Sequence, residues 1–376
     1  MAQVLHAATR KGLLTYRPGK GGAWRLDGTA FLGEPVSAAL HDARDGTLYA
    51  ALDLGHFGVK LHRSEDGGAN WTEVAAPAFA EEKDRPPPDP MSGEWPPKKE
   101  GPSVALIWTL APGGADRPGR IWAGTVPGGL FRSEDRGESW QLVESLWNEP
   151  SRPKWMGVVY DQAGMHSVLV DPRDSDRVTV AISTGGVWRT EDAGGSWTLF
   201  GNGMRNEYMP PDKMRDPLSQ DVHRMAACAV RPETVWVQHH NGIFRSEDGG
   251  LNFTEIEAEA PSRFGFTVAA HPKKPKTAWF VPAVKDQYRV AVDGRMVVTR
   301  TDDGGESFRA FSDGLPQENC FDLVYRHGLE LDGAAAHLAM GSTTGNLWVG
   351  SEDGAKWAHV AGFLPPIYQV SWGAEA

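Results

Sequence analysis

Ser64-Glu-Asp66-Gly-Gly68-Ala-Asn-Trp71 is the first of six closely related strings in this chain of 376 residues. The shared pattern is Ser/Thr-x-Asp-x-Gly-x-x-Trp/Phe, and the sixth copy is one residue shorter. The copies are centred on Asp66, Asp135, Asp192, Asp248, Asp303 and Asp353. Their spacing of 69, 57, 56, 55 and 50 residues leaves room for four short strands per copy, and such repetition indicates a repeat architecture.

Each repeated string has the chemistry of a tight turn. Ser, Thr and Asp side chains accept hydrogen bonds from nearby backbone N–H groups, and glycine permits the positive φ that such a turn needs. The aromatic residue opens the following strand and buries a large apolar face against a neighbouring sheet. Because the same aspartate recurs in six turns, we expect these carboxylates to stabilise the fold and not to catalyse a reaction.

The residues between the strings read as short strands. One unit contains four such segments, at residues 166–171, 177–182, 186–190 and 197–200. Strands at intervals of about 8–12 residues, separated by Gly and Asp-Pro turn signals, indicate small antiparallel sheets. No helical periodicity interrupts them.

A seventh unit begins the chain. Residues 4–9, 12–16 and 24–26 match the second, third and fourth strands of a unit whose first strand is missing. Residues 366–372 supply that strand, so both chain ends pair in one blade and the ring has no open edge. We predict an all-β fold: one domain over residues 1–376, forming a seven-bladed β-propeller with four-stranded antiparallel blades. The aromatic residues expected between blades are Trp24, Trp71, Trp140, Trp197, Phe253, Phe308 and Trp357.

The six strings resemble the Asp-box (BNR) repeats of the sialidase-like propeller superfamily. That superfamily includes sialidases, xyloglucan-cleaving glycosidases, sortilin-type receptor domains and photosystem II assembly factors. The resemblance implies the fold, and it implies that ligands bind on the face opposite the repeated turns, but it does not specify a reaction. True sialidases carry an Arg-Ile-Pro string near the first blade. This chain offers only Thr9-Arg10-Lys11 there, so we do not expect sialidase activity.

The composition narrows the class of partner. A formal net charge of −11 argues against nucleic acid or an anionic membrane, because phosphate binding needs a concentrated basic face. The N-terminal residues lack the basic start and apolar core of a secretory signal, and no run of about 18 apolar residues occurs. Cys228 and Cys320 lie in apolar stretches and read as buried thiols. These features favour a cytoplasmic protein, although a mature chain without its signal would look the same. The oligomeric state stays open.

Long connections are expected on the face opposite the repeated turns. They are residues 86–97, 146–161, 201–221 and 282–289, which belong to consecutive blades. Long loops on a rigid scaffold often carry function, and these contain several aromatic residues. They could equally be spacers or a dimer contact.

Four histidines are predicted to project toward this face: His166, His223, His239 and His240. Neutral imidazoles can transfer protons near pH 7 or ligate a metal, so we assign them candidate catalytic roles, assisted by Tyr160, Asp161 and Asp221. A divalent metal, if one is bound, would be held by His166, His223 and His240. The alternative is that the imidazoles only bond backbone carbonyl groups.

Substrate contacts are expected from aromatic and basic side chains near the same mouth. The candidates are Trp108, Trp155, Tyr208, Lys285 and Arg289. Two functions fit the pattern. One is a glycosyl-hydrolase-like hydrolase, or a lyase, acting on a small polar or saccharide-like molecule. The other is a non-catalytic binding or assembly propeller that recognises a glycan, a peptide or a partner protein.

Overall fold

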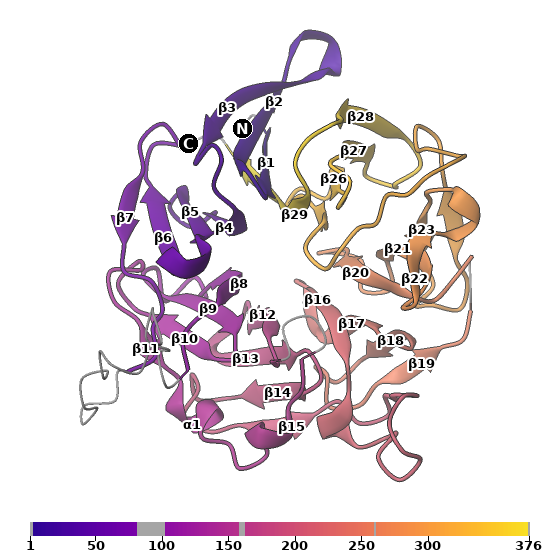
Figure 1. The fold of residues 1–376 in the computed structure, drawn as a ribbon. Coiled ribbons are helices and arrows are strands. Elements are labelled where there is room, and N and C mark those ends of the chain that lie inside the picture. Colours follow the sequence, from indigo (N-terminus) through magenta and orange to yellow (C-terminus); the bar gives the residue numbers. More distant parts are fainter. Residues whose placement is uncertain (1–2, 81–101, 158–161, 259–260, 375–376) are drawn as a thin grey trace, which may run out of the picture.

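The computed structural model describes residues 3–80, 102–157, 162–258 and 261–374, and in these residues seven antiparallel sheets are arranged around a ring (Figure 1). Each sheet is one blade with four strands in line, and one blade carries an additional fifth strand. The predicted all-β, seven-bladed propeller is therefore confirmed. The four strands expected between residues 166 and 200 are also confirmed, as β12 to β15.

The first four blades follow the chain from its N-terminus. Blade 1 contains β29 (Ile367–Ala374), β1 (Gln3–Thr9), β2 (Gly12–Pro18) and β3 (Trp24–Ala30). Blade 2 contains β4 (Val36–Asp42), β5 (Thr47–Asp53), β6 (Val59–Ser64) and β7 (Thr72–Val74). Blade 3 contains β8 (Leu106–Pro112), β9 (Ile121–Val126), β10 (Leu130–Ser133) and β11 (Gln141–Leu142). Blade 4 contains β12 (Met165–Asp171), β13 (Asp174–Ile182), β14 (Gly186–Thr190) and β15 (Thr198–Phe200).

The remaining three blades complete the ring. Blade 5 contains β16 (Val222–Cys228), β17 (Arg231–His239), β18 (Gly242–Ser246) and β19 (Thr254–Ile256). Blade 6 contains β20 (Gly265–Ala270), β21 (Ala278–Lys285), β23 (Val298–Thr301) and β24 (Arg309–Phe311), and β22 (Tyr288–Ala291) pairs with β21. Blade 7 contains β25 (Leu329–Leu331), β26 (His337–Gly341), β27 (Leu347–Ser351) and β28 (Trp357–Ala361).

Helical segments in the described residues are short. They are α1 (Glu144–Trp147) and single 3₁₀ turns at Lys20–Gly22, Gly55–Phe57, Arg152–Lys154, Pro217–Ser219 and Val292–Gly294. Within the described part of the chain, no helix is long and apolar enough to cross a membrane.

The two ends of the chain close the ring in blade 1. Strand β29 pairs antiparallel with β1 from Gln3 opposite Ala374 to Thr9 opposite Ile367, as the sequence predicts. The Gln369 amide then joins blade 1 to blade 2: its Oε1 accepts from the Ala39 N–H at 3.0 Å, and its Nε2 donates to the Ala39 carbonyl at 2.8 Å. Closure removes the unpaired strand edges that an open ring would expose.

The repeated strings form matching turns between the third and fourth strands of their blades. In blade 4, Thr190 Oγ1 donates to Asp192 Oδ1 at 2.6 Å, while the Gly194 N–H donates to Thr190 Oγ1 at 2.8 Å. The Ser196 N–H and hydroxyl donate to the two oxygens of Asp192 at 2.9 and 2.8 Å. Gly194 has φ of 93°, a conformation that favours glycine. Both carboxylate oxygens of Asp192 therefore accept hydrogen bonds from residues of the same turn.

Apolar side chains fill the space between adjacent blades. The largest fully buried ones include Trp122, Trp236, Trp279 and Trp348, each in the second or third strand of its blade. The aromatic residue that follows a repeated turn contacts the preceding blade; for example, Trp140 Nε1 donates to the Ala75 carbonyl at 2.9 Å. Cys228 and Cys320 are buried free thiols, as the sequence predicts.

The strand order gives the ring two different faces. The repeated turns and the connections from first to second strands lie at one end of the channel, which we name the turn face. The connections between blades, and those from second to third strands, lie at the opposite end, which we name the loop face. The first strand of each blade thus starts at the loop face, where the predicted histidines are placed.

Candidate functional site

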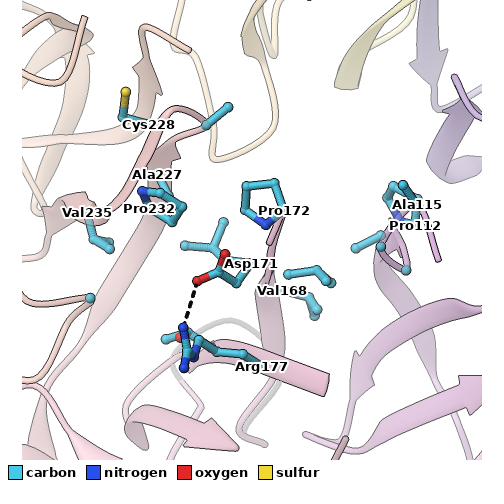
Figure 2. Close-up of a pocket in the computed structure, with 18 of the residues that line it drawn as sticks. Pro112, Ala115, Val168, Asp171, Pro172, Arg177, Ala227, Cys228, Pro232 and Val235 are labelled. Atoms are coloured by element: carbon cyan, nitrogen blue, oxygen red, sulfur yellow. Dashed lines mark hydrogen bonds and ion pairs between the residues drawn. The ribbon is translucent and has the colours of Figure 1, made fainter. Parts of the chain in front are cut away.

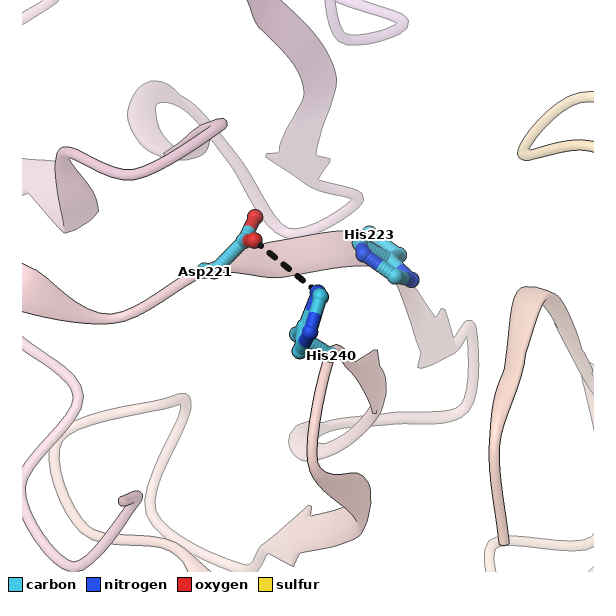
Figure 3. Close-up of side chains that lie close together, drawn as sticks. All are labelled: Asp221, His223 and His240. Carbon is cyan, nitrogen blue, oxygen red and sulfur yellow. Dashed lines mark ion pairs between the residues drawn. The ribbon is translucent and has the colours of Figure 1, made fainter. Parts of the chain in front are cut away.

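Three polar side chains of blade 5 come together on the loop face (Figure 3). Asp221 and His223 flank the first residue of β16, and His240 lies in the tight turn between β17 and β18. One potential ligand atom from each of the three side chains lies within 4.8 Å of the other two. The Asp221 Oδ2 and His240 Nδ1 atoms are 3.3 Å apart, and the His223 and His240 ring centroids are 5.4 Å apart. We name Asp221, His223 and His240 the blade 5 cluster.

The backbone of β16 explains this grouping. Residues two apart on a strand point to the same side, so Asp221 and His223 project together. The pairing of Val222 with His239 across the hairpin then places His240, the next residue, over the start of β16. The His240 N–H donates to the Asp221 carbonyl at 3.0 Å and fixes the turn in this position.

Asp221 is buried, with 1% of its surface exposed. Its Oδ2 accepts a hydrogen bond from the Tyr208 hydroxyl at 3.1 Å, whereas its Oδ1 has no hydrogen-bond partner in the described residues. Burial disfavours the charged carboxylate, but the contact with His240 and the neighbouring imidazoles outweighs burial and holds the pKa of Asp221 well below its usual value. A buried ionised oxygen without a donor is costly, and this is the only carboxylate oxygen of the described residues in that state.

His223 is oriented by the neighbouring blade. Its Nδ1 donates to the Gly265 carbonyl at 2.7 Å, so Nε2 is the nitrogen with a lone pair. Its ring stacks on Phe266 with centroids 4.6 Å apart. Burial lowers the pKa of His223 to about 3, against the opposing effect of Asp221, so the imidazole is neutral at pH 7.

Tyr208 covers the cluster from the 201–221 connection. Its hydroxyl lies 3.1 Å from Thr184 Oγ1 as well as from Asp221, and its ring meets the His240 ring edge-on at 5.1 Å. Burial and the nearby Asp221 carboxylate raise the pKa of Tyr208, so the phenol keeps its proton. Tyr208 has 46% of its surface exposed and the His240 side chain 15%, so these two rings form the solvent side of the cluster.

His239 is tied to the backbone and does not share the cluster. It is fully buried, its Nε2 faces the Asp221 N–H at 3.0 Å, and its Nδ1 faces the Asn241 N–H at 3.1 Å. A neutral imidazole can accept a hydrogen bond through only one nitrogen. Both nitrogens of His239 face backbone N–H groups, so neither is available to a ligand. These contacts match the alternative interpretation in which a histidine only holds backbone groups.

His166 lies in the central channel, outside the blade 5 cluster. It is fully buried, its Nδ1 lies 2.9 Å from Ser167 Oγ, and its Nε2 has no partner in the described residues. Its carbonyl accepts from His327 Nε2 at 2.8 Å and from Arg224 at 3.1 Å, which joins β12 to the opposite side of the ring. The metal set anticipated from sequence, with His166 in it, thus differs from the set that the fold brings together.

A cavity of about 220 Å³ lies at the loop-face mouth of the channel. Among the described residues, its lining combines two guanidinium groups (Arg289 and Arg326), one carboxylate (Asp53) and the aromatic rings of Trp108, Tyr325 and Tyr368. Trp108 and Arg289 are thus placed where the sequence analysis expects substrate contacts. Tyr325 meets Phe266 edge-on at 4.7 Å and His223 stacks on Phe266 at 4.6 Å, so the Phe266 ring contacts both a residue of the cavity and a residue of the cluster.

The other anticipated residues lie apart from this mouth. Trp155 is buried against Trp188, with ring centroids 6.0 Å apart, and lines a different cavity of about 400 Å³ with Arg152 and Gln162. Lys285 extends along the β21–β22 hairpin, its Nζ 5.0 Å from the Tyr288 ring. Tyr160, Asp161 and the Pro-rich connection at 86–97 lie outside the described residues.

Sequence reasoning missed Tyr325, Arg326 and His327, which line the mouth immediately before β25. They occupy the place in blade 7 that His166 and His223 occupy in blades 4 and 5, so aligning the repeats could have found them. Glu330 in β25 was also missed: burial raises its pKa to about 8, while the Arg224 guanidinium in the channel acts in the opposite direction.

A larger pocket of about 470 Å³ opens on the turn face (Figure 2). Its lining is mainly apolar, and its charged groups are paired with one another: Arg177 lies 3.3 Å from Asp171, and Arg44 lies 2.6 Å from Asp42. The volume of a pocket alone therefore does not identify the functional site. The unsatisfied carboxylate lies on the other face.

No family model matches the chain. In sequence, it is 28% identical over 149 residues to the oligoxyloglucan-reducing end-specific xyloglucanase of Emericella nidulans, and this match covers 39% of the chain and 15% of that protein. The chain therefore corresponds to a small part of the length of this curated relative.

Solved structures show the same fold. An ancestral GH74 enzyme superposes with a TM-score of 0.59 at 16% identity, over 90% of this chain and 38% of that one. YCF48 bound to D1 peptide superposes with a TM-score of 0.52 at 15% identity, over 91% and 90% of the two chains. The chain is thus a seven-bladed propeller of the kind found in glycosyl hydrolases, with weak sequence similarity to a xyloglucanase.

Proposed function

We propose that the chain is a hydrolase that acts on a saccharide-like substrate bearing an acidic group, bound in the loop-face mouth. The observation that carries the proposal is Asp221, a buried ionised carboxylate with one free oxygen, held against His240 and Tyr208 beside the mouth cavity. A buried titratable group with a strongly shifted pKa in a concave site is typical of catalytic centres. The weak sequence match to a xyloglucanase supports the same class of reaction.

The mouth cavity has the surface chemistry that a sugar acid needs. Trp108 and Tyr325 offer flat apolar faces to sugar rings, and Arg289 and Arg326 can bond an acidic group. Arg289 is already placed by its ion pair with Asp286 and by the Phe266 ring, 5.4 Å from its guanidinium carbon. A charged side chain that is already held in position loses little conformational entropy when a ligand binds, which favours binding.

The blade 5 cluster would activate water. The oxygen of this water would form a bond to the substrate carbon, and the bond from that carbon to the leaving oxygen would break. The proton released by the water would end on the leaving oxygen. Asp221 orients the His240 imidazole, and the Tyr208 hydroxyl donates to Asp221 and holds this carboxylate in place. In this assignment His240 contacts the reacting water, Asp221 positions His240, and Trp108 and Arg289 bind the substrate.

Hydrolysis of xyloglucan oligosaccharides and of chromogenic uronides and neutral glycosides tests the proposal, with release of product as the measurement. Asp221→Asn should lower kcat by about 10²- to 10⁴-fold, because it removes the charge that orients His240. Trp108→Ala should raise KM and leave kcat nearly unchanged. The matched control is Asp248→Asn, in the repeated turn of the same blade, which should keep full activity. Equal loss in both aspartate variants would contradict the proposal.

A binding propeller is the second candidate, and one observation favours it. Among the described residues that line the mouth cavity, Asp53 is the one carboxylate, whereas glycosidases commonly use two carboxylates about 5–10 Å apart. If no substrate of the panel is turned over but oligosaccharides or acidic peptides bind, and Trp108→Ala abolishes that binding, the mouth is a recognition surface.

A further inference from the structure

The blade 5 cluster has the ligand types of a metal centre: one carboxylate and two imidazoles, with all three potential ligand atoms within 4.8 Å. We propose that Asp221, His223 and His240 bind one divalent transition-metal ion, zinc in the first place, through Asp221 Oδ, His223 Nε2 and His240 Nδ1. This set differs from the all-histidine set anticipated from the sequence. It deepens the proposed function, since the cation would lie where water is to be activated.

The separation of Asp221 and His240 fits two ligands of one ion. A charge-assisted N–H···O bond is usually about 2.7–2.9 Å long. Ligands about 2.0–2.1 Å from a tetrahedral zinc ion lie roughly 3.3 Å from each other. The Asp221 Oδ2 to His240 Nδ1 distance is 3.3 Å, which matches the second value (Figure 3). Moving His223 inward by on the order of 1 Å would complete the set.

The unpartnered oxygen of Asp221 is an independent sign of a missing ligand. Asp221 is 1% exposed, and its Oδ1 receives no hydrogen bond from the described residues, although the other oxygen is bonded by Tyr208. A buried carboxylate is normally paired, hydrogen-bonded or bound to a metal. A cation bound by both carboxylate oxygens, Oδ2 on the His240 side and the unpartnered Oδ1, would remove the cost of leaving Oδ1 bare.

The groups behind the three ligands are those that orient metal ligands in proteins. His223 Nδ1 donates to the Gly265 carbonyl, which leaves Nε2 directed away from the backbone with its lone pair available. The Tyr208 hydroxyl donates to Asp221, as second-layer groups usually do for a ligating carboxylate. Three protein ligands leave one position of a tetrahedral ion for water.

Direct titration of the full chain tests the site. Protein freed of metal with a chelator should bind one Zn²⁺ per chain in calorimetry with submicromolar Kd. The Co²⁺ form should show the visible absorption of a four- or five-coordinate ion. Asp221→Asn, His223→Gln and His240→Gln should each weaken Zn²⁺ binding at least 100-fold, while circular dichroism shows an unchanged β-sheet signal.

Two histidine variants serve as controls. His56→Gln removes an exposed imidazole of blade 2, and His166→Gln removes the buried channel imidazole; both should retain the zinc affinity of the parent. Loss of binding in His166→Gln, equal affinity in the three cluster variants and the parent, or the absence of a submicromolar site would each overturn the proposal. If a cluster variant fails to fold, the Co²⁺ spectrum of the parent still decides, because three protein ligands of this kind produce it and octahedral hydrated Co²⁺ does not.

Metal binding and hydrolysis can fail separately. If zinc binds at the cluster and no substrate is turned over, the metal site stands and the hydrolase assignment falls. If the metal-free protein hydrolyses substrate at the full rate and Zn²⁺ does not bind, the cluster acts by proton transfer alone and the metal proposal falls.

Discussion

The two faces of the ring use aspartate in opposite ways. On the turn face, Asp192 accepts hydrogen bonds from Thr190 and from both donors of Ser196, and these lower the pKa of its carboxyl to about 2. On the loop face, Asp221 is nearly inaccessible, yet one of its oxygens has no donor. The turn carboxylate is exposed and satisfied, whereas the cluster carboxylate is buried and incomplete.

This difference is the physical basis for giving Asp192 a structural role and proposing a functional role for Asp221. A carboxylate whose acceptors are all occupied by its own turn contributes to stability and has nothing left to offer a ligand. A buried carboxylate with an open acceptor still has a bond to offer when a cation or substrate arrives. We therefore expect changes at the two positions to affect different properties.

Acid titration should separate the two faces most strongly. Burial holds the pKa of His166 and His327 well below 6.5, so both are neutral in the folded chain and take up protons on unfolding. Stability should be fully present above pH 6.5 and fall below it, by up to about 1.4 kcal/mol per pH unit for each histidine. The turn carboxylates, such as Asp192, should add a second loss only between about pH 4 and 2.

Urea unfolding at pH 7, 6, 5 and 4 measures the first loss. His166→Gln should give a shallower decline than the parent, because glutamine takes up no proton in the unfolded state. If the free energy of unfolding does not change between pH 7 and 5, the buried histidines are already protonated in the folded chain. The buried histidines and the turn carboxylates would then not differ in the pH range where stability is lost.

Asp192→Ala should have the next largest effect. The turn would lose the acceptor for Thr190 Oγ1 and for the Ser196 N–H and hydroxyl. Because the site is exposed, water replaces part of this bonding, and we expect a loss of about 1–2 kcal/mol, similar to the removal of a helix-capping residue. Chemical denaturation measures it, and zinc affinity and hydrolysis should be those of the parent.

Asp221→Ala should change stability less than Asp192→Ala although Asp221 is far more buried. Alanine removes the bond from Tyr208 and the contact with His240, but it also removes the cost of a desolvated charge with an unsatisfied oxygen, and we expect these effects to offset each other within about 1 kcal/mol. Zinc binding and hydrolysis should be lost. A loss of stability well above that of Asp192→Ala would show that Asp221 is structural after all.

The fold could be predicted from the sequence because the residues that determine each turn are close together in the chain. A Ser/Thr, an Asp, a Gly and an aromatic residue at fixed spacing determine each turn, and the same string recurs six times. Ring closure followed from counting, since blade 1 lacked one strand and residues 366–372 supplied one. Blade 7 was harder, because its first strand, Leu329–Leu331, has only three residues and follows an irregular segment.

The candidate site could be predicted in part. Asp221, His223 and His240 were all anticipated near one mouth, because strand alternation and hairpin connections place them at the loop face. Which histidines meet depends on register and on the direction of each ring. The opposition of Val222 and His239 brings His240 to Asp221, whereas His166, one blade away, lies beside Ser167 and Trp108. Spacing in the sequence does not contain that information.

The smallest effect is expected for Arg177→Gln in the turn-face pocket. Arg177 is partly exposed, and its partners Asp171 and Glu191 lie 3.3 and 2.7 Å away, so the loss of these ion pairs should cost less than about 1 kcal/mol. This pocket, of about 470 Å³, is larger than the mouth cavity of about 220 Å³, yet its charges are paired and its walls are mainly apolar. Zinc affinity, KM and kcat should therefore all equal those of the parent. A change in zinc affinity, KM or kcat would indicate that the functional site lies on the turn face. The ion pairs of Arg177 lie on the opposite side of the ring from the blade 5 cluster, so their loss should not affect that cluster.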